Sequence, residues 1–205
     1  MSNLLSVIWL SLSCTPGTES FRKLLDRFSS AEEIFAADDS EIAACVGSKS
    51  RDYASLTDKN TDEAERILDF CESKNVGILT YFDERFPNAL KKIKNPPVLL
   101  YYRGTLPDFN GNFFASIVGT RKLTTYGRNH TFTLANDLAR AGAIIVSGMA
   151  IGIDGVALAG ALSASMPTVA IIGSGIDVCY PIQHRRLARE IVKRGCVMTE
   201  YAPGT

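Results

Sequence analysis

The sequence predicts an α/β protein: a small, mainly helical domain followed by a Rossmann-like parallel sheet with helices on both faces, incomplete at its C-terminus. Two observations lead to this prediction. Before about residue 111, apolar residues recur at helical spacing in short segments. From residue 113 onward, apolar strand-like runs, glycine turns and helical stretches alternate. Between them lies the turn-forming segment Pro107-Asp108-Phe109-Asn110-Gly111-Asn112, so we expect domains at 1–111 and 112–205.

The first domain shows helix-start signals at three places. Thr18 follows a Pro16-Gly17 break and is expected to cap a helix, Ser30 and Glu33 resemble a capping box, and Thr61 precedes a longer amphipathic helix. The apolar run at 4–10 lacks a preceding Lys or Arg and is broken by serine, so it predicts a buried helix rather than a signal peptide. Runs at 76–81 and 96–102 predict strands.

The second domain is expected to hold four strands, at 113–118, 143–146, 168–172 and 196–199. Helices are expected between them at 126–141, with Leu134, Leu138 and Ala141 facing inward, at about 154–164, and at about 183–194. The usual strand order 3-2-1-4 would place the turn after the first strand opposite Glu200 and Tyr201, across the crevice where such folds bind ligands.

Small residues mark the ends of the first three strands and predict a ligand-binding rim. Glycine lets a ligand approach the backbone, free N–H groups point outward, and Arg121 and Lys122 favour a phosphate-sized anion. The residues concerned are Gly119, Thr120, Arg121 and Lys122, then Ser147 and Gly148, then Gly173, Ser174 and Gly175.

Charge distribution agrees mildly with this prediction. Residues 1–111 carry 13 basic and 17 acidic side chains, and residues 112–205 carry nine and five, although the whole chain is neutral. An anionic ligand of the second domain and ordinary surface scatter explain this bias about equally well. On the last helix, Arg185, Arg189 and Lys193 form one basic stripe, for which an exposed helix face is preferred over phosphate contact.

Cofactor and catalytic patterns are sparse. The sequence has no GxGxxG or GxxxxGK[ST] loop, and neither Ser147 nor Ser174 lies in a GxSxG motif, so we expect no nucleotide cofactor and no enzyme activity. Asp154 is interpreted as a helix cap, and Glu200 stays open between a site acid and a turn residue. The five cysteines form no CxxC pair, and with two histidines they predict no metal site but reduced thiols in the cytoplasm. No run approaches the length of a membrane span.

Four ordered motifs, GTRKLTTYGR, SGMAIGIDGVALAGAL, IIGSGIDVCYPIQHRRLA and TEYAPGT, closely resemble the bacterial DNA-processing protein A family (DprA, also called Smf). The resemblance is strong over residues 113–205 and looser before them. It implies single-stranded DNA binding without catalysis, protection of incoming DNA in natural transformation, and loading of the RecA recombinase. It also implies DNA contacts at the rim residues named above and at Arg128, which ends the first motif.

The chain departs from the family pattern in two respects. Ile151, Leu158, Ala159 and Pro167 stand where relatives often have basic or polar residues, which is expected to weaken DNA binding. The family continues past Pro203-Gly204-Thr205, so we expect a chain cut short, with an exposed edge on the fourth strand and a doubtful homodimer and RecA contact. The alternative function is nucleotide-phosphate hydrolysis of the lysine-decarboxylase-like (LOG) type, whose PGGxGTxxE signature is absent.

Overall fold

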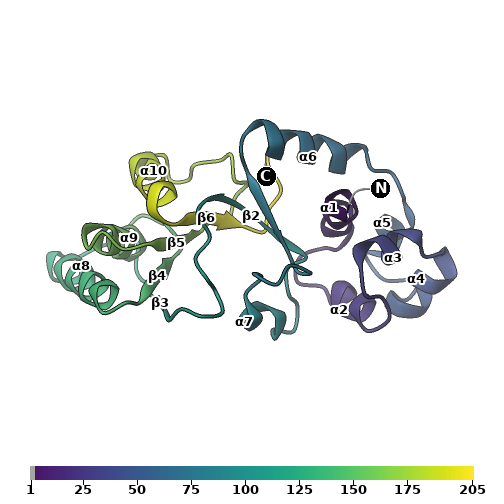
Figure 1. The fold of residues 1–205 in the computed structure, drawn as a ribbon, viewed down its shortest axis with the longest axis horizontal. Coiled ribbons are helices and arrows are strands. Elements are labelled where there is room, and N and C mark those ends of the chain that lie inside the picture. Colours follow the sequence, from purple (N-terminus) through teal and green to yellow (C-terminus); the bar gives the residue numbers. More distant parts are fainter. Residues whose placement is uncertain (1–2) are drawn as a thin grey trace. The chain divides into compact units, whose positions relative to one another are not determined.

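The computed structural model describes residues 3–205 and divides into two compact units, the first ending at Leu100 and the second spanning Tyr101–Thr205 (Figure 1). The division falls before Tyr101 rather than after Gly111. The reason is strand β2 (Leu99–Gly104), which pairs antiparallel with the last strand, β6 (Cys196–Thr199), in the register Tyr101 to Thr199. Most of β2 therefore belongs to the second unit.

The first unit is mainly helical, as predicted. Its core includes Val7, Ile8 and Leu10 of the first helix, all fully buried. None of the helices in the described part of the chain is long and apolar enough to cross a membrane. The elements are α1 (Asn3–Ser13), α2 (Ser20–Leu25), α3 (Ala31–Ala36), α4 (Asp39–Val46), α5 (Tyr53–Thr57), α6 (Asp62–Ser73), β1 (Gly77–Thr80) and α7 (Asn88–Lys91).

Buried Asp52 organises the turn that precedes α2. Its carboxylate accepts hydrogen bonds from the Thr15 amide (3.1 Å) and from the hydroxyls of Thr15 (2.6 Å) and Thr18 (2.7 Å). The prediction that Thr18 caps α2 was wrong, because Glu19 holds the cap position and the Thr18 hydroxyl bonds to Asp52. Ser30 does cap α3 by accepting from the Glu33 amide.

In the second unit, the strands of the sheet lie in the order β2-β6-β5-β4-β3. Strands β3 to β6 run parallel to one another, and β2 runs antiparallel beside β6. The new ranges are β3 (Phe114–Ser116), β4 (Ile144–Ser147) and β5 (Thr168–Ile171). The Rossmann-like α/β class is confirmed, and all four predicted strands are present.

The predicted strand order 3-2-1-4 was wrong. Each strand from β3 to β6 lies beside the one before it, so β6 and β3 are three places apart, about 14 Å at ordinary strand spacing. Glu200 and Tyr201, which follow β6, therefore do not face the turn after β3. The expected exposed edge on the fourth strand was also wrong, because β2 covers that edge of β6. Sequence reasoning had assigned the β2 run to the first domain and left β6 without a partner.

Three helices of the second unit lie side by side on one face of the sheet (Figure 1). They are α8 (Thr125–Arg140), α9 (Ile153–Ser163) and α10 (Arg185–Arg194), the last preceded by a 3-10 turn at Ile182–His184. The expectation of helices on both faces is not met by these three. Right-handed connections that always advance in the same direction place their helices on the same face, and only a reversal of strand order uses the other face.

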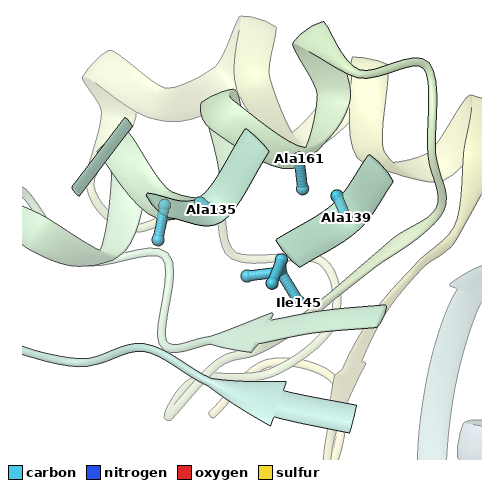
Figure 2. Close-up of a cluster of buried hydrophobic side chains, with 5 residues drawn as sticks. Ala135, Ala139, Ile145 and Ala161 are labelled. Carbon is cyan, nitrogen blue, oxygen red and sulfur yellow. The ribbon is translucent and has the colours of Figure 1, made fainter. Parts of the chain in front are cut away.

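Helices α8 and α9 pack through small side chains (Figure 2). Ala135 and Ala139 are fully buried against Ala161 and Ile145, and a Cβ on Gly160 would lie 2.7 Å from the Phe132 carbonyl oxygen. The predicted inward face was wrong for Leu134, which is 53% exposed, and for exposed Ala141, but right for Leu138, which is half-buried and packs against this cluster. Close helix approach favours alanine at the contact, whereas the sequence reading chose the larger apolar side chains.

Candidate nucleic-acid interface

The turn after β3 is held against the start of α9. The Gly119 amide donates to the Asp154 carboxylate (3.3 Å), and the Ile153 amide donates to the Thr120 carbonyl oxygen (3.1 Å). A Cβ on Gly119 would lie 2.7 Å from the Ile153 side chain, which explains the glycine. The start of α9 thus fixes the backbone of this turn, while Gly119, Thr120 and Arg121 remain exposed.

Fewer backbone N–H groups are free at this turn than predicted. Asp154 takes the Gly119 amide, and the Thr120 hydroxyl accepts from the Lys122 amide (3.1 Å). Thr124 caps the first turn of α8, because its hydroxyl accepts a hydrogen bond from the Gly127 amide (3.0 Å). An anion at this place would accordingly meet mainly the exposed side chains of Arg121 and Lys122.

Asp154 joins two strand ends instead of capping its own helix. It is 9% exposed, and besides the Gly119 amide it lies against Gly148, where a Cβ would be 2.7 Å from its Oδ2. Ser147 reinforces the link, since its hydroxyl donates to the Ile117 carbonyl oxygen (2.6 Å). The structure therefore brings together the predicted residues at the ends of β3 and β4, with the Gly148 backbone exposed.

The three predicted residues after β5 differ in their exposure. Gly173 is exposed and has open space around it, whereas Gly175 is buried: its amide donates to the Thr205 carbonyl oxygen (2.8 Å), and a Cβ would lie 2.7 Å from the Ala202 carbonyl oxygen. The Ser174 hydroxyl donates to the Val178 carbonyl oxygen (3.2 Å). Of these three predicted residues, Gly173 is the best placed to meet a ligand, and Gly175 supports the loop.

Next to the turn after β3 lies a cavity of about 680 Å³ that the sequence reasoning did not anticipate. Arg128 reaches it from α8, together with Phe132, and Ile151 and His184 also line it. The His184 Nδ1 lies 2.8 Å from the Met149 carbonyl oxygen, and the ring packs so close to Gly155 that no Cβ would fit there. The glycine after Asp154 was the available sequence signal for this close approach.

The positions that depart from the family pattern differ in their placement. Leu158 is fully buried, so it cannot contact a ligand at the surface. Pro167 precedes β5 and so lies at the amino end of that strand, away from the glycine turns at the carboxyl ends. Ile151, which is 47% exposed, and half-buried Ala159 do line the cavity. The expected loss of phosphate partners is thus confined to the cavity wall.

Parallel strands joined by helices define a Rossmann-like α/β protein, and exposed glycines and cations lie at the carboxyl ends of its strands. The chain belongs to the DNA recombination-mediator protein A family, whose model matches residues 77–205. This confirms the family resemblance found in the motifs.

Relatives and solved structures agree with this assignment. The Smf protein of Synechocystis is 30% identical over all of this chain, which spans about half (53%) of that relative. The X-ray structure of DNA processing protein A (DprA) from Streptococcus pneumoniae matches with a TM-score of 0.73 and 29% identity, covering 100% of this chain and 69% of that one. The structure of DNA processing protein A from Helicobacter pylori, described for its unique single-stranded DNA binding mode, matches with a TM-score of 0.54 and 34% identity, covering 63% and 57%.

Proposed function

We propose that this chain binds single-stranded DNA along the carboxyl ends of β3, β4 and β5. The observation that carries the proposal is the fixed turn after β3, which presents Arg121 and Lys122 to solvent beside the exposed backbone of Gly148. Membership of the family and the single-stranded DNA binding mode described for the Helicobacter protein support it.

Each part of the rim has a distinct role in this proposal. Arg121 pairs with a phosphate in a bidentate manner, and Lys122 adds a second positive charge. Gly119, Gly148 and Gly173 allow the DNA backbone to come close, and Arg128 meets the strand where it passes the cavity. Because these contacts involve phosphates rather than base edges, binding is independent of sequence.

We extend the proposal to the cellular role. In this role it protects incoming DNA in natural transformation and loads RecA onto it without catalysis, and the family's description as a recombination mediator supports the part in recombination. A homodimer and a RecA contact are part of the same proposal. They draw on the whole length of the relatives, about half of which this chain spans.

Fluorescence anisotropy with a labelled oligo-dT, measured across a salt series, tests the binding proposal. We expect Arg121→Ala to weaken binding by roughly tenfold and to reduce the salt slope by about 0.7, the value for one phosphate contact on a single strand. Arg140→Ala is the matched control, because Arg140 is exposed near the other end of α8, where its guanidinium bonds to Asn136. Equal affinities of the parent, Arg121→Ala and Arg140→Ala would contradict a site at this turn.

A further inference from the structure

A second cationic feature lies beside α10, separate from Arg121 and Lys122. It is a groove of about 770 Å³ between α10, β2 and the loop after β5. Its basic lining residues are Arg103, Arg185, Arg186, Arg189 and Lys193. We refer to this feature as the α10 groove.

The sheet edge explains why the α10 groove exists. Helix α10 packs on β5 and β6, whereas β2 extends the sheet by one more strand beyond β6. Arg103 of β2 is paired with Val197 of β6, so the two side chains emerge on the same face, and both line the groove. Gly104 then lets β2 pass under the end of α10, since a Cβ there would clash with the Val192 carbonyl oxygen.

Positive charge dominates the groove. The acidic residues that line it are Asp177 and Glu190. Asp177 accepts from the Gly204 amide (2.9 Å), and Glu190 is paired with Lys193 (2.7 Å), a hydrogen bond that lowers the pKa of its carboxyl. Arg103 also has a buried Nε that finds no hydrogen-bond partner anywhere in residues 3–205. Five cations against two carboxylates that are already hydrogen-bonded make the groove suited to an anion.

The spacing of the cations indicates a chain of anions rather than one. Arg185, Arg189 and Lys193 are successive i, i+4 neighbours on α10, so they follow one another at about 6 Å and span about 12 Å. A single phosphate could meet at most one or two of them. A phosphodiester backbone running along the helix could meet all three, while the apolar floor, which includes Ile176 and Val178, would receive sugars or bases.

The groove shares the loop after β5 with the rim, the exposed residues at the carboxyl ends of β3, β4 and β5. Ile176 follows Gly173-Ser174-Gly175 directly in the chain and lines the groove, as does Ile172 before them. Because one loop carries both exposed Gly173 and the groove residue Ile176, a DNA strand bound at Gly173 would lie next to the groove. We propose that the α10 groove binds the phosphate backbone of the same DNA single strand, in the part that extends beyond the rim. This inference rests on the proposed function and lengthens its binding site.

The test compares salt slopes for oligo-dT of about 4 and about 16 nucleotides. The variant is Arg185→Gln with Arg189→Gln and Lys193→Gln, and the control is Arg140→Gln with Arg194→Gln. Arg194 is a fit control because it lies on the same helix but outside the groove, bonded to the Leu162 carbonyl oxygen (3.1 Å). We expect the groove variant to lower the slope for the long oligonucleotide by about 2, three contacts of about 0.7 each, and to leave the short one unchanged.

The outcomes separate the two proposals. If the parent binds both lengths and the groove variant keeps the parental slope on the long one, the α10 groove inference is overturned and the rim proposal stands. If the folded parent binds neither oligonucleotide, both the rim proposal and the α10 groove inference are overturned. Competition by poly-glutamate that disappears in the groove variant, with the long-oligonucleotide slope intact, would instead assign the groove to an acidic polypeptide and overturn the inference. Should the triple variant unfold, single Arg189→Gln with an expected decrease of about 0.7 replaces it, with Arg194→Gln as control.

Discussion

Two buried carboxylates, one in each unit, each hold a turn in place, but they do so with different numbers of donors. Asp52 in the first unit is 2% exposed and accepts hydrogen bonds from Thr15, Thr18 and Ser20. Asp154 in the second unit is 9% exposed and accepts from the Gly119 amide at 3.3 Å. The first is saturated by its turn and serves stability, whereas the second ties the strand-tip rim together with one longer bond. The comparison suggests that a carboxylate's role can be inferred from how completely its turn satisfies it.

The largest effect is expected for Asp52→Ala. Removing this carboxylate takes away the acceptor of the Thr15 amide and hydroxyl and one of the two acceptors of the Thr18 hydroxyl, and should lower the free energy of unfolding by about 3 kcal/mol. Urea unfolding followed by circular dichroism measures this loss. Asp38→Ala is a control of the same residue type, because Asp38 is exposed and caps α4, so its loss should cost about 1 kcal/mol. Equal losses in the free energy of unfolding would show that buried Asp52 contributes no more to stability than the exposed cap Asp38.

Asp154→Ala should show the opposite balance. It removes one long hydrogen bond, so we expect a stability loss of about 1 kcal/mol, but freeing the turn after β3 should weaken oligo-dT binding severalfold. Unfolding and anisotropy measured on the same preparation compare the two effects. Asp154→Asn is the matched variant, since an amide oxygen can still accept from Gly119. If Asp154→Ala loses stability as Asp52→Ala does and keeps its affinity, the two carboxylates play the same role.

The smallest effect concerns pH. Burial raises the pKa of Asp52, but hydrogen bonds from Ser20, Thr15 and Thr18 outweigh it and leave that pKa below its usual value. A lowered pKa in the folded state means that this stabilisation is present above about pH 4, the unfolded value, and is lost as pH falls through the folded value. The stability gap between the parent and Asp52→Asn should therefore be constant from pH 7 to about 5 and shrink below pH 4. A gap that widens on acidification would reverse the assigned sign.

What could be predicted from the sequence was the local pattern. Alternating apolar runs and glycine turns located all four parallel strands, because a buried strand and a tight turn each need particular residue types at neighbouring positions. The same reasoning found Gly119, Gly148 and Arg121, which the structure brings to one edge of the sheet or exposes beside it. These features depend on a few consecutive residues.

Features set by distant partners were missed. The pairing of β2 with β6 joins residues about a hundred positions apart, and no local sequence pattern near either strand indicates it. The inward face of α8 depends on how closely α9 approaches, so Ala135 and Ala139 are buried there while Leu134 is exposed. Asp154 looked like a cap because its partner, Gly119, lies 35 residues earlier. The α10 groove likewise needs Arg103, from a strand assigned to the other domain.

Gly173 and Gly175 lie in one short loop, but they differ in the space available for a side chain. The space beside Gly173 is open, while Gly175 is enclosed by the Ala202 carbonyl oxygen and the Gly204 amide. A side chain added at Gly173 would therefore extend into open space, whereas a Cβ at Gly175 would lie 2.7 Å from the Ala202 carbonyl oxygen. One substitution at Gly173 could thus change what a ligand would meet at the proposed binding site without disturbing the loop that Gly175 holds in place.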